Sequence, residues 1–256
     1  MLCLGKRPGI AQQFKITTTT MSHPQPLSYS AALGQGASSS QPNTASRKEV
    51  QPSAPVSRQP EPVRPAKRSP SPSHVPRTSA TEDDVFVLTL LTDRAHHDRM
   101  TALRKKYFPS KINKLAAHLT LFHALPGSKL ESSILPTIKE LAGQTAPFHV
   151  RAESPFRMKK GFAVSISEGG KQGGEIHRAL QGPWKAEGFL SDQDAGGARL
   201  HYTLMNKVDD ENAVSSAYQE LVENWRGDGG MVEGLALWRY ERGYWKWVRK
   251  FDFDHA

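Results

Sequence analysis

The chain has 256 residues, a formal net charge of +9 and a single cysteine, Cys3. One cysteine excludes a disulfide framework and a cysteine-based zinc cage within one chain. The sequence has no apolar run of about 18 residues, so we predict no membrane-spanning helix and no membrane partner.

The first 82 residues differ in composition from the rest of the chain. They hold twelve of the 18 prolines, many serines and threonines, and ten basic residues against three acids. Such a composition buries too little apolar surface to offset about 1–2 kcal/mol of backbone entropy per residue. We predict that residues 1–82 form a disordered, basic, Pro/Ser-rich tail that could recruit protein partners, and that residues 83–256 fold.

The charge of the predicted folded part is nearly balanced, with 24 basic and 22 acidic residues. This balance argues against a broad nucleic-acid-binding surface, which needs clustered Lys and Arg. Basic residues among hydroxyl residues near Lys6 and Lys15 resemble a transit peptide only weakly, and the prolines argue against one. We therefore expect a cytoplasmic or nuclear monomer, with the mitochondrion as the weaker alternative.

From residue 83 onward the hydrophobic pattern predicts alternating strands and helices. The expected strands are Val85–Leu91, His118–Leu125, Phe148–Ala152, Phe162–Ser167, Leu200–Val208, Val232–Tyr240 and Tyr244–Phe253. The expected helices are Arg94–Phe108, Glu131–Ala142, Glu175–Glu187 with a break at Gly182-Pro183, and Asp210–Trp225. The last two strands read as an antiparallel hairpin, which indicates an α+β domain rather than a doubly wound parallel sheet.

One pattern, His-x-Thr followed by an apolar residue, occurs at residues 118–121 and again at 201–204. Each copy opens a predicted strand and precedes a predicted helix. Residues i and i+2 of a strand share a face, so His118 lies beside Thr120 and His201 beside Thr203. On a regular strand His123 faces the other way, so it cannot share a metal ion with His118.

Two imidazoles and two hydroxyls suit the cleavage of a phosphodiester without a metal ion or other cofactor. With an ordinary pKa near 6.5, one histidine can accept the proton of the nucleophile while the other protonates the leaving oxygen. Threonine hydroxyls can donate hydrogen bonds to the non-bridging phosphate oxygens. We therefore predict His118, Thr120, His201 and Thr203 as the catalytic residues.

These paired motifs, with the run from Tyr107 to Pro126 and the ending from Gly234 to Phe251, resemble the 2H phosphoesterase superfamily and its 2′-5′ RNA ligase-like branch. The resemblance implies a bilobal, pseudo-two-fold α+β fold in which antiparallel sheets flank a central cleft. It also implies metal-independent opening of 2′,3′-cyclic phosphates, or cleavage and joining of 2′-5′ linkages, on RNA ends or small nucleotides. We assign His201 to activating water and His118 to protonating the ribose oxygen, although the spacing leaves the reverse assignment open.

Several neighbouring residues are candidates for substrate binding. Arg199 could pair with phosphate, and Phe122 and Met205 continue the inward faces, where core packing is the alternative. We expect His96-His97 at the surface, and we expect the aromatic residues of the last two strands to fill a core, with base stacking as the alternative. Two further readings of the chain stay open: a module that binds RNA ends or nucleotides without turnover, and an adaptor that acts through its tail.

Overall fold

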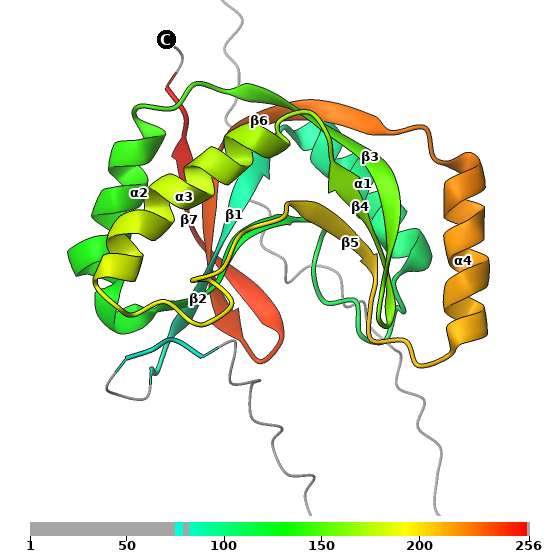
Figure 1. The fold of residues 1–256 in the computed structure, drawn as a ribbon, viewed down its shortest axis with the longest axis horizontal. Helices are drawn as coiled ribbons and strands as arrows, with labels where there is room; N and C mark the ends of the chain where they lie inside the picture. Colours follow the sequence, from blue (N-terminus) through cyan, green and yellow to red (C-terminus); the bar gives the residue numbers. More distant parts are fainter. Residues whose placement is uncertain (1–74, 79–81, 255–256) are drawn as a thin grey trace, which may run out of the picture. The chain divides into compact units, whose positions relative to one another are not determined.

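The computed structural model describes residues 75–78 and 82–254, and an antiparallel sheet forms their centre (Figure 1). Nearly all of the predicted tail lies outside the described residues. The strands of the sheet are β1 (Val85–Thr92), β2 (Leu119–Pro126), β3 (Phe148–Met158), β4 (Gly161–Ile166), β5 (His201–Met205), β6 (Asp228–Glu241) and β7 (Tyr244–Asp252). The helices are α1 (Arg94–Tyr107), α2 (Leu135–Ala142), α3 (Gly170–Ala186) and α4 (Glu211–Asn224).

The long strand β6 joins the two halves of the sheet. Its second half lies between β1 and β7, and its first half pairs with β3. The strand order is β2-β1-β6-β3-β4-β5, so β2 and β5 are the two ends of this path. The predicted bilobal, antiparallel α+β fold is therefore confirmed, with the two lobes built on the halves of one sheet that β6 joins.

The two halves repeat one unit, in which a strand, a helix and a second strand follow each other. The first unit is β1-α1-β2 and the second is β4-α3-β5. The helices are exchanged, because α1 packs against β5 and α3 packs against β2. Each of the two strands that carry a His-x-Thr motif therefore packs against the helix of the other half.

The helix starts follow from local sequence. The side chain of Asp93 accepts a hydrogen bond from the backbone N–H of His96 and caps α1, and Asp210 caps α4 in the same way. Such caps satisfy donors that the first turn of a helix leaves unpaired. A short π-helical turn (Leu130–Ile134) precedes α2, and Pro136 stands at the start of α2, so this helix begins four residues later than the predicted Glu131.

Two element boundaries differ most from the predictions. Helix α3 begins five residues before Glu175 and passes Pro183 without a break. Its early glycines look like a loop in sequence, but Gly173 lies where a Cβ atom would come within 2.2 Å of the Leu200 side chain, so glycine allows the helix to pack closely. Strand β3 continues to Met158, because beyond Ala152 it pairs only with β4 and can hold proline along its open edge.

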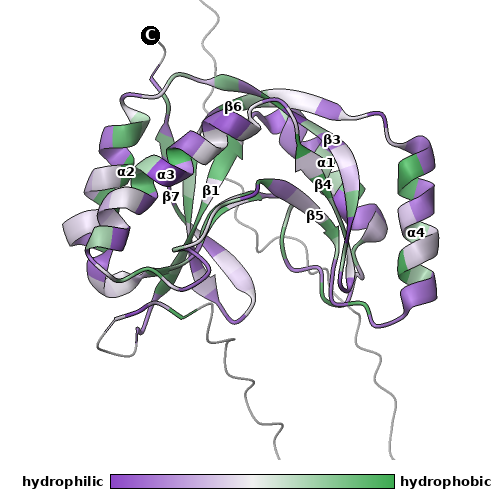
Figure 2. Ribbon diagram, viewed as in Figure 1, coloured by the Kyte–Doolittle hydropathy of each residue, from purple (hydrophilic) through white to green (hydrophobic). Residues whose placement is uncertain are grey.

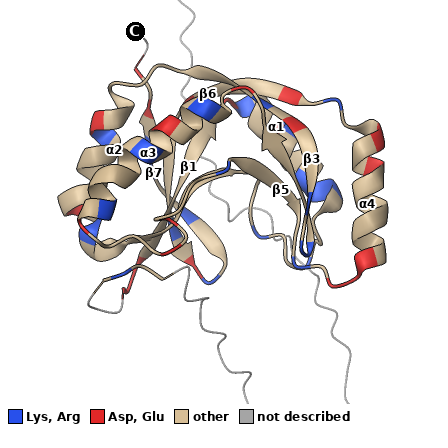
Figure 3. Ribbon diagram, viewed as in Figure 1, with Lys and Arg blue, Asp and Glu red and all other residues tan. Residues whose placement is uncertain are grey.

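The core lies between the sheet and its helices, and Trp184, Tyr202 and Phe162 are among its largest buried side chains. Figure 2 shows hydrophobic residues along the strands and at intervals along α2, α3 and α4. Figure 3 shows that Lys, Arg, Asp and Glu gather on helices and turns, while most of β1 and β5 carries no charge. Among the described residues, no helix is both long and apolar enough to span a membrane.

Candidate active site

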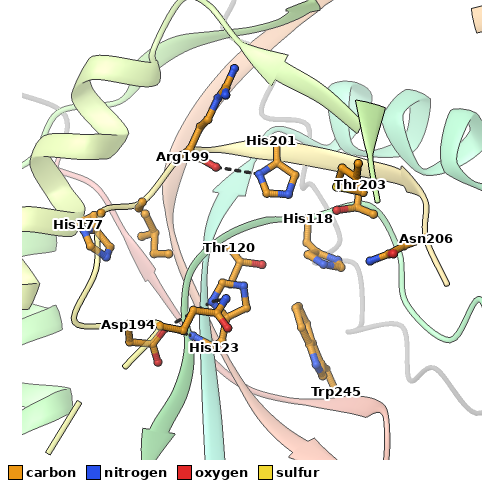
Figure 4. A pocket seen from close by; sticks show the side chains of 15 residues that line it. His118, Thr120, His123, His177, Asp194, Arg199, His201, Thr203, Asn206 and Trp245 are labelled. Atoms are coloured by element: carbon orange, nitrogen blue, oxygen red, sulfur yellow. Dashed lines mark hydrogen bonds and ion pairs between the residues drawn. The ribbon is translucent and has the colours of Figure 1, made fainter. Parts of the chain in front are cut away.

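The two His-x-Thr motifs line one cavity of about 440 Å³. It lies between β2 and β5, and the loop that connects α3 to β5 closes one side (Figure 4). His118, Thr120, His201 and Thr203 all contribute to its wall. The structure therefore brings together the four residues that the sequence predicts as catalytic.

Both histidines are held in the same way by the backbone. The Nδ1 atom of His118 donates to the carbonyl oxygen of Ala116 at 2.8 Å, and Nδ1 of His201 donates to that of Arg199 at 2.8 Å. Because a carbonyl oxygen can only accept, Nδ1 carries the hydrogen in each ring. The Nε2 atom is therefore the one that can accept or donate a proton in the cavity.

Burial changes the electrostatics of His118. It lowers the pKa of His118 to about 3, and the positive charge of Arg104 adds to the shift. Protein surrounds the ring on most sides, including Trp245 at 4.4 Å between ring centroids, while one edge stays open to the cavity. His118 is therefore neutral in the free protein at neutral pH.

Each motif strand carries a β-bulge directly after its threonine. In β2, Thr120 lies opposite Thr89 and Phe122 opposite Leu88, so Leu121 has no partner of its own. In β5, Thr203 lies opposite Ala163 and Met205 opposite Phe162. Leu204 is therefore the extra residue there. A bulge reverses the alternation of the strand beyond it.

The bulges overturn two predictions about the motif neighbours. Phe122 is fully buried and stacks on His177 at 4.6 Å, and Met205 is 7% exposed, so both belong to the core rather than to the cavity wall. Instead, His123 and Asn206 face the cavity, at matching positions relative to the two motifs. The expectation that His123 faces away from His118 is therefore wrong.

A buried carboxylate holds His123 in place. Asp194 accepts hydrogen bonds from the backbone N–H groups of His123 and Ala124 at 2.8 and 2.9 Å, and its Oδ1 lies 3.4 Å from Nδ1 of His123. Burial alone would raise the pKa of Asp194, but these bonds lower it below its ordinary value. Asp194 thus stays ionised and fixes the loop before β5 against β2.

Arg104 of α1 binds the backbone of the segments that carry both motifs. Its guanidinium donates to the carbonyl oxygens of Leu115, three residues before His118, and of Thr203. The side chain is 5% exposed and lies over the Phe108 ring at 3.9 Å. Because one buried cation binds both backbone segments, Arg104 fixes the approach of β2 to β5. No feature of its place in the sequence indicated this contact.

Arg199 does not point at the histidine pair. Its side chain is exposed, extends away from the cavity and lies over the Phe156 ring at 5.0 Å (Figure 4). What Arg199 supplies to the site in this conformation is its carbonyl oxygen, which orients His201. The predicted pairing of its guanidinium with phosphate needs a different side-chain conformation.

His96 is buried, contrary to its predicted surface position. Its Nδ1 lies 2.6 Å from Asp228 Oδ1, and its Nε2 lies 3.0 Å from the hydroxyl of Tyr202. Tyr202 is the residue between His201 and Thr203, on the opposite face of β5. The network therefore anchors the second motif strand to α1 and β6.

The described residues contain no group of three or more His, Cys, Asp or Glu side chains arranged to hold a metal ion. The fixed groups of the cavity are instead proton carriers and hydrogen-bond donors. The arrangement can transfer one proton at each end of a reacting group placed between His118 and His201.

Comparison with known proteins identifies a family and similar folds. Residues 92–244 match the family model of the 2′-5′ RNA ligase superfamily. No curated protein matches the sequence significantly. A crystal structure of a phosphoesterase is similar at a TM-score of 0.51 and 11% identity, covering 68% of this chain and all of the other. LigT of Escherichia coli in complex with 3′-AMP has a TM-score of 0.49 and 13% identity, covering 67% of this chain and 99% of its own.

Proposed function

Because this chain belongs to the 2′-5′ RNA ligase superfamily, whose members carry phosphodiesterase-type activity, we propose that it cleaves phosphodiesters of RNA ends or small nucleotides without a metal ion. The substrates are nucleoside or RNA 2′,3′-cyclic phosphates, or 2′-5′ linkages. One observation carries the proposal: His118 and His201 line the same cavity, and each has Nδ1 bound to the carbonyl oxygen two residues earlier.

In the proposed hydrolysis a cyclic phosphate lies between the two rings. One histidine takes a proton from water, the water oxygen forms a bond to phosphorus, and the bond from phosphorus to one ribose oxygen breaks. The other histidine gives its proton to that ribose oxygen, so the product is a phosphomonoester. Thr120 and Thr203 donate hydrogen bonds to the non-bridging oxygens, where negative charge gathers in the transition state.

We propose that His118 is the base and His201 the acid, the reverse of the assignment favoured from sequence. The low pKa of His118 supports this direction, because a neutral ring can accept a proton from water. The anionic phosphate that enters the cavity raises this pKa toward a useful range, since a nearby negative charge favours the protonated ring.

The test compares His118→Ala and His201→Ala with the parent chain on nucleoside 2′,3′-cyclic phosphates and on a 2′-5′-linked dinucleotide, in the presence of EDTA. We expect each variant to lose about 10²–10⁴-fold in kcat. His149→Ala is the control, because His149 is an exposed histidine of β3 outside the cavity. Unchanged turnover in both cavity variants would contradict the site, and loss of the parent's activity in EDTA would contradict the metal-free mechanism.

A substrate with a 4-nitrophenyl leaving group separates the two roles, because nitrophenolate departs without being protonated. His201→Ala should recover most of its activity on this substrate, while His118→Ala should stay slow. The opposite pattern would restore the assignment made from sequence. Binding of nucleotides without turnover of any substrate would instead favour the non-catalytic binding module.

A further inference from the structure

Four aromatic residues of β6 and β7 share one face of the sheet. Trp238 lies opposite Trp247, and Tyr240 lies opposite Trp245. Residues that lie opposite each other on neighbouring strands project to the same face. On β1 the same register places Thr89 opposite Ala236, two residues from Trp238 and on its face.

This face also carries the first catalytic motif. Thr89 lies opposite Thr120 across the β1–β2 pair, so Thr120 and the aromatic residues project to the same side of the sheet. The rings form a path away from the cavity: Trp245 is 4.4 Å from His118, Trp238 is 6.3 Å from Trp245, and Trp247 is 5.0 Å from Trp238. We call the rings of Trp238, Tyr240, Trp245 and Trp247 the aromatic platform.

The outer rings of the platform are not in a core. Tyr240 is 48% exposed and Trp247 is 49% exposed. The prediction that these aromatic residues fill a core is therefore wrong for both. Large exposed aromatic side chains on one sheet face, beside a candidate active site, need a functional reason.

A second cavity, of about 370 Å³, lies along the platform. Trp238, Trp247 and Thr89 line it, and it shares His118 with the catalytic cavity. Its volume falls within the range of about 300–1,000 Å³ typical of small-molecule sites. A ligand whose phosphate lies at the histidines can therefore continue into this cavity without leaving the protein surface.

We propose that the aromatic platform stacks the unpaired bases of an RNA strand whose terminal phosphate lies between His118 and His201. This inference rests on the proposed function and narrows its substrate to an RNA end several nucleotides long. Base-on-aromatic stacking is worth about 1–3 kcal/mol per base and tolerates any base. The phosphate in the catalytic cavity fixes one end of the strand, and the platform supplies surface for the nucleotides next to it.

The charges at the second cavity are opposite in sign, because Arg94 and Glu233 both line it. Lys250, which lies opposite Ala236 on the platform face, is paired with Asp252 at 2.9 Å. Few phosphates can then be neutralised along this face. The affinity for RNA should therefore depend only weakly on salt, unlike that of a surface that tracks the backbone with Lys and Arg.

The test compares a hexanucleotide that ends in a 2′,3′-cyclic phosphate with the corresponding mononucleoside 2′,3′-cyclic phosphate. The quantity is the ratio of kcat/KM for the two substrates. We expect Trp247→Ala and Tyr240→Ala to lower this ratio by roughly 5- to 150-fold, the equivalent of one lost stack. Tyr244→Ala is the matched control, since Tyr244 is at least as exposed but lies opposite Glu241 on the other face, beside Lys114. It should keep the parent ratio.

Binding separates this inference from the proposed function. In the His201→Ala background, anisotropy of a labelled single-stranded hexanucleotide is measured with and without Trp247→Ala, at low and high salt. Weaker binding in the double variant, with a shallow salt dependence, supports the platform even if no turnover is found. Equal RNA binding with and without Trp247→Ala would overturn the proposal. If Trp247→Ala instead changed the oligomeric state in sedimentation and left RNA binding unchanged, the aromatic platform would be an interface between copies of the chain.

Discussion

The burial of His118 makes the stability of the fold depend on pH. Its pKa is about 3 in the folded chain, against an ordinary value near 6.5. Between these values the unfolded chain binds a proton that the folded chain does not. The stability that the neutral, buried His118 ring gives to the fold is therefore fully present above pH 6.5 and is lost as the pH falls toward 3.

The size of this effect follows from the shift. Each pH unit between the two pKa values costs at most about 1.4 kcal/mol, so the loss from pH 7 to pH 5 is at most about 2 kcal/mol. Because one edge of the ring contacts the open cavity, solvent screens part of the effect. We therefore expect the free energy of unfolding to fall by about 1 kcal/mol from pH 7 to pH 5 through this ring.

His118→Asn removes the titrating ring and isolates this contribution. The free energy of unfolding, from urea titrations followed by circular dichroism, should fall by about 1 kcal/mol less in the variant than in the parent between pH 7 and pH 5. Burial also lowers the pKa values of His97 and His177, but both rings are present in each protein, so their effects cancel. His149→Asn, on the exposed side of β3, is the control. Equal losses in the parent and in His118→Asn would refute the reasoning.

Two further variants test the groups that position the cavity. Arg104→Met keeps the length of the side chain but leaves the carbonyl oxygens of Leu115 and Thr203 without this donor; we expect about 2–4 kcal/mol lower stability by thermal unfolding and lower kcat. Asp194→Asn removes the charge that accepts the N–H groups of His123 and Ala124; we expect about 1–3 kcal/mol lower stability by urea titration. Surface substitutions usually change stability by no more than about 0.5 kcal/mol. A change that small in either variant would contradict the role given to that residue.

The parts of the fold that could be predicted from sequence are those with a local cause. The strand β1 and the capped helices α1 and α4 come close to the predicted bounds because apolar periodicity and cap residues act over a few positions. The histidine and threonine of each motif stay on one face because only two residues separate them. The hairpin of β6 and β7 turns at Arg242-Gly243, where both residues have positive φ and favour a tight turn.

The remaining features depend on contacts between distant segments. A bulge is defined by two strands together, so the placement of His123 and Asn206 could not be found from the period of β2 or β5 alone. The start of α3 depends on Gly173 meeting Leu200, and the burial of His96 depends on Asp228, more than 130 positions away. A sequence pattern predicts a contact between distant segments only when it is already known which two segments lie side by side.

The repeated bulge extends the duplication beyond the motif that the sequence made visible. Each motif gives the cavity a histidine, a threonine and, after the bulge, one more polar residue, which is His123 in β2 and Asn206 directly after β5. The first two of these positions match in the two copies, and the third differs. The two proposed proton-transfer groups thus occupy matching positions of the repeat, which suits a displacement with one proton transfer at each end of the reacting group. The substrate of the proposed reaction has no such symmetry, and the cavity departs from it at His123 and Asn206.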